Sequence, residues 1–159
     1  MADVMYTEFK DKEVQDFLSG LQKNLKGIKD GTKKYAGLLS VIVFRDVTDH
    51  FEGQQGSEGA WAKWSESYRK HMASIGRDGN KILQFSGRLR QNFKPTDYKT
   101  QTDGILWFND AQTKSGFPYA AAHDNGGEKL PKRDFMWLSD KAMDNVGEQT
   151  LQFMLDEGV

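Results

Sequence analysis

The sequence contains no cysteine and only three prolines among its 159 residues. Without cysteine the chain has no disulfide, no thiolate metal site and no thiol nucleophile, which fits a reducing compartment. Long hydrophobic runs are also missing, since even the stretch Val41 to Phe44 is far too short to cross a bilayer. The first ten residues contain no basic segment followed by an apolar one, so we expect neither a signal peptide nor membrane association.

Charge of one sign is lacking too, because 22 basic and 23 acidic side chains leave a formal net charge of -1. This balance predicts no general attraction to nucleic acid or to an anionic membrane, so any such contact would be local. Hydrophobic residues make up 37% of the chain and the mean hydropathy is -0.72, which predicts a thin core. Ten phenylalanines, five tyrosines and four tryptophans add large apolar area and suit partner surfaces, so we expect one domain that forms oligomers.

Helical periodicity begins after a short N-terminal segment. We interpret residues 1 to 10 as a flexible arm that a partner could order, followed by a single domain over residues 11 to 159. Apolar residues at spacings of three and four predict a first helix from Asp11. A second helix, capped by Thr32 and apolar on one broad face as far as Phe51, would complete a helical hairpin.

Two polar, glycine-containing segments, Glu52 to Gly59 and Asp110 to Pro118, are interpreted as long loops. The first is expected to be exposed and mobile. It is not a phosphate-binding loop, because Glu58 places a carboxylate where a phosphate would approach. After it, aromatic and apolar residues at spacings of three and four predict an ordered turn or short helix that belongs to the core or an interface. These residues are Trp61, Trp64, Tyr68 and Met72.

An Asp-Gly dipeptide at residues 103 to 104 predicts a β-hairpin, since this dipeptide favours a two-residue turn. Such a turn would pair Thr102 with Ile105 and Thr100 with Trp107. An isolated hairpin is marginally stable in water, so we expect a further strand elsewhere in the chain.

The apolar run Phe135 to Leu138 is the strand candidate, and Ser139 after it is expected to cap a terminal helix. Ser86 is expected to cap a shorter helix that runs toward Phe93. The predicted fold class is therefore α+β, with an N-terminal helical hairpin and a C-terminal helix packed on a small, mainly antiparallel sheet.

We expect no catalytic residue, no cofactor and no metal site. The adjacent His and Asp residues, Asp49-His50 and His123-Asp124, point in different directions from a helix or strand and form no dyad by themselves. No His-x-x-x-His spacing is present for zinc. A small hydrolase with a triad assembled from distant segments stays open as an alternative.

A local basic group offers a candidate weak contact with DNA. Arg88, Arg90 and Lys94 lie close together in the sequence beside Phe93. Three charges without a wider basic field are also typical of a solvated surface, so both interpretations stay open.

Three stretches resemble one protein family. They read Phe-Ser-Gly-Arg-Leu at 85–89, Tyr-Ala-Ala-Ala-His-Asp-Asn-Gly at 119–126 and Leu-Pro-Lys-Arg-Asp-Phe at 130–135. Their letters, order and spacing are similar to those of the bacteriophage virion morphogenesis or tail-completion (neck) family, and the likeness covers nearly all of residues 11 to 155. The family often has Pro where this chain has Asp134. The resemblance implies a structural signature consisting of Ser86, Gly87, Leu89, Tyr119, His123, Gly126, Pro131, Arg133 and Phe135.

The resemblance also implies a function. It indicates a non-enzymatic protein of the virion neck, made in the host cytoplasm, that forms a sixfold or related ring at the head-proximal end of the tail. Its neighbours would be phage connector or head-completion, tail-terminator or tail-tube proteins, and DNA would pass nearby. A neck protein that contacts DNA without sequence preference is the alternative. We expect the arm and the two loops to make the subunit contacts, and Arg133 to bind backbone carbonyls or a carboxylate.

Overall fold

The computed structural model describes residues 12–29, 33–79, 81–101, 104–128 and 130–156. The arm predicted for residues 1 to 10 and the cap predicted at Thr32 lie outside these ranges. No helix in the described ranges is long and apolar enough to cross a membrane. The elements are α1 (Lys12–Lys29), α2 (Lys33–Gly53), β1 (Gln55–Gly56), β2 (Gly59–Ala60), α3 (Glu66–Ser74), α4 (Arg88–Gln91), β3 (Tyr98–Gln101), β4 (Gly104–Trp107), α5 (Tyr119–Asn125) and α6 (Asp140–Leu155).

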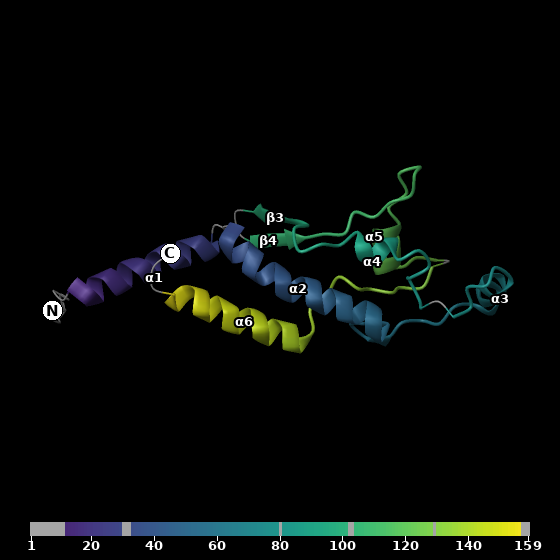
Figure 1. The fold of residues 1–159 in the computed structure, drawn as a ribbon, viewed down its shortest axis with the longest axis horizontal. Helices are drawn as coiled ribbons and strands as arrows, with labels where there is room; N and C mark the ends of the chain where they lie inside the picture. The colour runs from purple at the N-terminus through teal and green to yellow at the C-terminus, as the bar shows by residue number, and fades with distance from the viewer. Residues whose placement is uncertain (1–11, 30–32, 80, 102–103, 129, 157–159) are drawn as a thin grey trace, which may run out of the picture.

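Helix α2 is the centre of the molecule, with α6 on one side and the β3–β4 hairpin on the other (Figure 1). Its broad apolar face explains this position, because side chains point from it in both directions. Tyr35 packs against Phe153 of α6 with ring centroids 5.2 Å apart, while Ile105 and Trp107 of β4 join the same cluster. The predicted α+β class is confirmed, with helices at both ends of the described chain and two small antiparallel sheets.

Helices α1 and α2 lie one after the other along the long axis, with a bend between them. Helix α6 packs along both of them (Figure 1). The two N-terminal helices are therefore not packed side by side, as a helical hairpin would require. Helix α6 takes the place of the expected partner. The Asn24 amide of α1 donates to the carbonyls of Met154 and Asp156 at 3.2 and 3.0 Å, which satisfies acceptors at the end of α6.

The β3–β4 hairpin exists, but the predicted register is wrong by two residues. Thr100 lies opposite Ile105, and Tyr98 opposite Trp107. A shift of two residues leaves the same side chains on each face, so hydrophobic alternation cannot distinguish the two registers. The Trp107 indole donates to Ser40 Oγ of α2 at 2.9 Å, which fixes strand β4 on the helix.

The predicted third strand at Phe135 to Leu138 is wrong, because this run has no regular secondary structure. Side chains replace the strand partner. Asp124 accepts from the backbone N–H groups of Phe135 and Met136 at 2.8 and 3.1 Å, and His50 Nδ1 donates to the Phe135 carbonyl at 3.0 Å. The expected burial of Phe135 is confirmed at 1% exposure. Packing against α2 supports the hairpin instead of a third strand.

The segment Glu52 to Gly59 is not a plain exposed loop. Helix α2 extends to Gly53, and the short strands β1 and β2 follow with a tight turn between them. Gly56 is buried within this turn.

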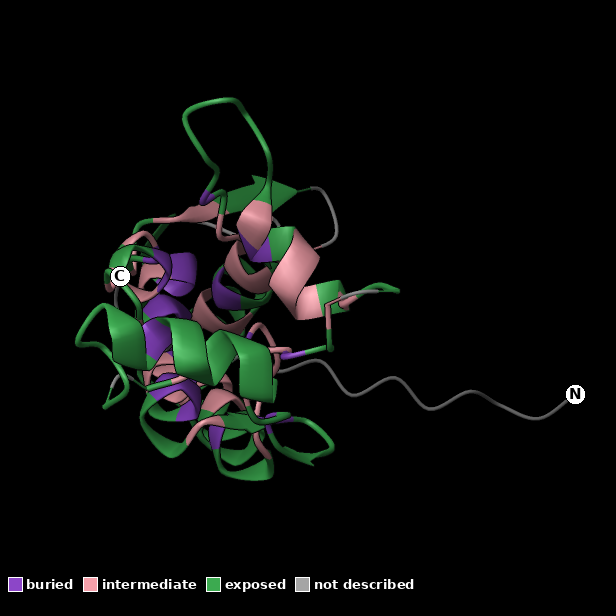
Figure 2. Cartoon of the chain, turned by 90° about the vertical axis from the view of Figure 1, so that its right-hand side faces the viewer, coloured by how far each residue is buried: buried purple, intermediate pink, exposed green. Residues whose placement is uncertain are grey.

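The main core lies around the C-terminal half of α2. Among the described residues, nine buried side chains form it, and Phe51 at its centre is fully buried. The Phe51 ring contacts Trp61 edge-on at 5.6 Å and Phe135 at 5.1 Å. Figure 2 looks along the long axis and shows buried segments surrounded by exposed ones. The core thus gathers segments that are far apart in the sequence.

The terminal cap is confirmed. Ser139 precedes α6, and its hydroxyl accepts from the Ala142 backbone N–H at 3.2 Å. The predicted cap of α4 needs correction, because Gly87 occupies that position with a φ of 72° and gives no side-chain hydrogen bond. Ser86 lies one residue earlier and accepts from the Arg88 N–H at 3.4 Å.

Candidate functional site

A pocket of about 750 Å³ lies between α3 and α5. One wall is made by residues 62–65 and Tyr68 of α3. The other is made by α5, the segment that follows it, and four residues near α4: Leu83, Phe85, Ser86 and Leu89. Six of the nine signature residues line this pocket. They are Ser86, Leu89, Tyr119, His123, Pro131 and Arg133.

Helix α5 brings Tyr119 and His123 to the pocket, because residues four apart lie on the same helix face. The sequence interpretation missed this helix. Its signal is three consecutive alanines, which have the highest helix propensity, followed by a glycine end. The Gly126 N–H closes the last turn by donating to the Ala122 carbonyl at 3.0 Å.

Gly126 is required by close packing. Its φ is 71°, and a Cβ there would lie 2.7 Å from the Lys132 backbone nitrogen. The next residue, Gly127, has open space around the same position and exchanges two backbone hydrogen bonds with Leu130. The glycine pair therefore has two roles, and only Gly126 lets the chain fold back against the end of α5.

Arg133 connects the two walls of the pocket. Its side chain is 6% exposed, and it donates from Nε to the Ala62 carbonyl at 3.0 Å and from Nη2 to the Lys63 carbonyl at 3.4 Å. Its backbone N–H donates to the His123 carbonyl at 2.8 Å. The prediction that the guanidinium binds backbone carbonyls is confirmed. Among the described residues it forms no ion pair.

Burial lowers the pKa of Arg133, and the Tyr68 hydroxyl opposes this shift. The guanidinium nevertheless stays cationic, because arginine is not deprotonated in proteins. Burial also lowers the pKa of His123, and the nearby charge of Arg133 lowers it further. His123 Nδ1 is buried with no hydrogen-bond partner among the described residues. The pocket therefore combines a fixed cation with an imidazole whose pKa is lowered.

The adjacent residues His123 and Asp124 do not form a hydrogen-bonded dyad. The Asp124 carboxylate accepts from backbone N–H groups, not from the adjacent His123. An Asp46 carboxylate oxygen lies 3.5 Å from His50 Nε2. The same carboxylate accepts hydrogen bonds from the backbone N–H and the hydroxyl of Ser139. This Ser-Asp-His group was not predicted. Its serine donates to the aspartate and not to the histidine, so the histidine does not activate a nucleophile.

Asp134, where the family often has Pro, ties the pocket segment to the β1–β2 turn. Its carboxylate accepts from the Ser57 N–H at 3.0 Å and also from the Ser57 hydroxyl. Burial alone would raise the pKa of Asp134, but the Ser57 hydrogen bonds and the Lys132 ammonium outweigh it, so this pKa is lowered. A Cβ on Gly56 would lie 2.2 Å from Asp134 Oδ1, so a larger residue at 56 would displace the carboxylate from this position.

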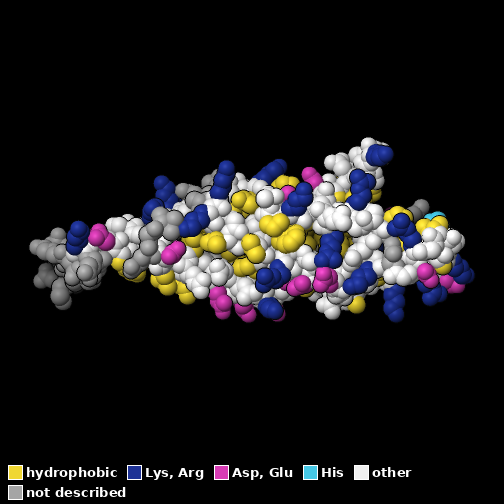
Figure 3. Space-filling view, viewed as in Figure 1, with side chains coloured by type: hydrophobic (Ala, Val, Ile, Leu, Met, Phe, Trp, Pro, Cys, Tyr) yellow, Lys and Arg dark blue, Asp and Glu magenta, His cyan; other side chains and the backbone are white. Residues whose placement is uncertain are grey.

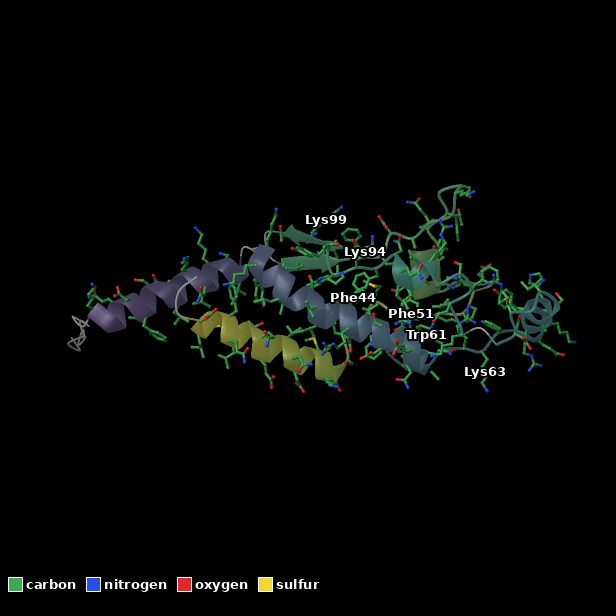
Figure 4. The ribbon with its side chains drawn as sticks, viewed as in Figure 1. Phe44, Phe51, Trp61, Lys63, Lys94 and Lys99 are labelled. Atoms are coloured by element: carbon green, nitrogen blue, oxygen red, sulfur yellow. The ribbon has the colours of Figure 1, made fainter. Side chains whose placement is uncertain are left out.

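The basic residues proposed for DNA contact do not form a free positive patch. Arg90 pairs with Glu52 of α2 at 2.7 Å. Figure 3 shows basic and acidic side chains interspersed along the molecule. Lys63, another basic residue near α3, does not extend the group, because Figure 4 places it well away from Lys94. The remaining two charges, Arg88 and Lys94, resemble a solvated surface more than a nucleic-acid site.

In the described part of the chain, no group of three His, Asp or Glu residues could hold a metal ion. Comparisons with models of protein families, with curated proteins and with solved structures find no match. The function therefore has to be argued from the site and from the motifs that form it.

Proposed function

We propose that this chain is a structural protein of the phage neck, which forms a ring at the head-proximal end of the tail and joins tail to head. One observation carries the proposal. The three motifs that resemble the tail-completion family are separated in sequence but meet around one pocket. The hydrogen bond from the Arg133 backbone N–H to the His123 carbonyl and the close approach of Gly126 to Lys132 hold the backbones of two of these motifs together.

The surface supports an assembling protein. Large hydrophobic side chains are exposed on α1 and α6, including Phe17 at 42%, Leu25 at 43% and Leu151 at 56%. Contiguous apolar area on a protein surface is typical of sites that a neighbouring protein covers, so we take these side chains of α1 and α6 as part of a contact surface. The virion neck as location, its ring symmetry and the neighbouring phage proteins are parts of the same proposal.

The decisive experiment is electron microscopy of particles made without this protein by the phage that encodes it. We expect filled heads and tails to accumulate separately, and joined particles to return when the protein is supplied. Normal virions in its absence would contradict the proposal. Cryo-electron microscopy of the intact neck tests the ring, because a single off-axis copy or density only on the capsid would contradict it.

A further inference from the structure

The pocket has the chemistry of a site for an acidic, aromatic peptide. Its walls carry the aromatic side chains Trp64, Tyr68, Phe85 and Tyr119 and the cations Lys63 and Arg133, and none of its lining residues is acidic. Tyr68 and Phe85 are 42% and 47% exposed, so part of this apolar surface is uncovered. A segment that brings carboxylates and aromatic rings would complement both features.

Such a segment is present in the chain. Residues 3–9 read Asp-Val-Met-Tyr-Thr-Glu-Phe, with two carboxylates, two aromatic rings and no basic residue. We propose that residues 3–9 of a second copy of this chain occupy the pocket. In this arrangement the Glu8 carboxylate pairs with Arg133 and Lys63, and the rings of Tyr6 and Phe9 lie against the aromatic walls. This proposal rests on the proposed function, because it names a contact by which copies join.

The distance along the molecule requires a second copy. Helix α1 begins at one end of the long axis and α3, beside the pocket, lies at the other (Figure 1). The 18 residues of α1 and the 21 residues of α2 lie one after the other with a bend between them, and the lengths of the two helices add to about 58 Å at 1.5 Å per residue. Residues 1–11 reach at most about 40 Å when fully extended. The arm therefore cannot fill its own pocket.

A contact between the arm of one copy and the pocket of the next is head to tail. Contacts of this kind close into a ring when the rotation between copies permits, and otherwise continue as a filament. Arg133 is suited to the contact, because the pocket wall already holds its guanidinium in place and little freedom remains to be lost on binding.

Disulfide crosslinking of the full chain tests the proposal, and the absence of native cysteine keeps the background clean. Thr7→Cys is combined with Ser86→Cys on one wall or with Lys63→Cys on the other. Both pocket positions are exposed, so folding should be retained. Under mild oxidation we expect a ladder of dimers and higher species from at least one of these pairs. Thr7→Cys with Lys141→Cys, an exposed position on α6, is the control and should remain monomeric.

Three results would overturn the proposal. These are no intermolecular disulfide from either pocket pair, an internal disulfide within one chain, or an equally strong ladder from the control pair. Because the crosslink is measured on purified protein, its failure would leave the particle experiment on neck function unaffected. Separate heads and tails without a crosslink would mean a different contact between copies.

A charge exchange tests the role of Glu8. In the Thr7→Cys, Ser86→Cys background, Lys63→Glu should lower the crosslinked fraction roughly two- to fivefold, as expected for a surface ion pair. Adding Glu8→Lys to the same chain should restore it. If neither change alters the yield, residues 3–9 are not the occupant.

Discussion

At the pocket end of the molecule nine buried residues form one core, whereas at the helical end the described core has only three, Tyr35, Leu39 and Phe153. Apart from the end of α2, the pocket end has only short helices and strands, and side chains such as Asp124, Arg133 and Asp134 bind its backbone directly. The helical end consists of long helices that leave several large apolar side chains exposed, among them Phe17, Leu25 and Leu151. The difference teaches that regular secondary structure and the size of the buried core are separate, and that the end with the longer helices has the smaller core of its own.

Removing one phenyl ring from each end tests this comparison most strongly. Phe135→Ala should lower the free energy of unfolding by about 3–5 kcal/mol, because the ring fills the larger core. Phe153→Ala should cost about 2–3 kcal/mol, since its cluster is small and close to solvent. Urea unfolding measures both. Equal losses would contradict the difference between the two ends.

The two adjacent glycines sharpen the comparison within the pocket end. Gly126→Ala should cost about 2–4 kcal/mol, because it combines a positive φ with a clash against the Lys132 backbone. Gly127→Ala is the matched control and should change stability by about 0.5 kcal/mol or less, since its surroundings are open. Thermal unfolding of the two variants compares them directly, and similar midpoints would show that Gly126 is not constrained.

Arg133→Lys tests whether fork geometry, and not charge alone, connects the pocket walls. Lysine keeps the charge but cannot donate to the Ala62 and Lys63 carbonyls in the same arrangement, so we expect a loss of about 1–3 kcal/mol. Arg45→Lys, at an exposed position on α2, serves as the control with a change of about 0.5 kcal/mol or less. Chemical denaturation that gives equal values for the two variants would argue against this role.

The smallest expected effect is a pH dependence from His123. Its pKa is lowered in the folded chain, so above the ordinary histidine value near 6.5 it is neutral in both states and has no effect. Below that value the unfolded chain takes up a proton first, and stability falls until the lower folded pKa is passed. His123→Gln should flatten the unfolding free energy measured between about pH 7 and 5. His71→Gln, exposed on α3, should leave the original slope.

The sequence predicted long elements better than it predicted their packing. Periodicity identified α1, α2 and α6 and the Ser139 cap, because these depend on neighbouring residues. It could not show that α6 packs along α1, since apolar faces do not specify their partners. The hairpin register could not be predicted either, because the predicted and the observed registers place Ile105 and Trp107 on the same face.

The candidate site was predicted in part. The signature residues came from motif resemblance, and the prediction for Arg133 followed from its position between a proline and an apolar run. The opposite wall, with Trp64 and Tyr68, was interpreted only as core or interface. The pairing of Asp134 with Ser57 spans 77 positions, and no local pattern indicates such a contact.

That contact also constrains how sequences of this type can diverge. Gly56 and Asp134 approach so closely that a side chain at position 56 would overlap the carboxylate. A side chain at position 56 therefore requires the Asp134 carboxylate to move or to be replaced, whereas Asp134 can change while glycine stays at 56. A chain with proline at position 134, as the tail-completion pattern often has, would lack the carboxylate, so that the Trp61 ring, 3.3 Å from a Cβ at position 56, would be the remaining close neighbour. Among natural variants we therefore expect glycine at 56 wherever aspartate stands at 134, and other residues at 56 only where 134 is not aspartate.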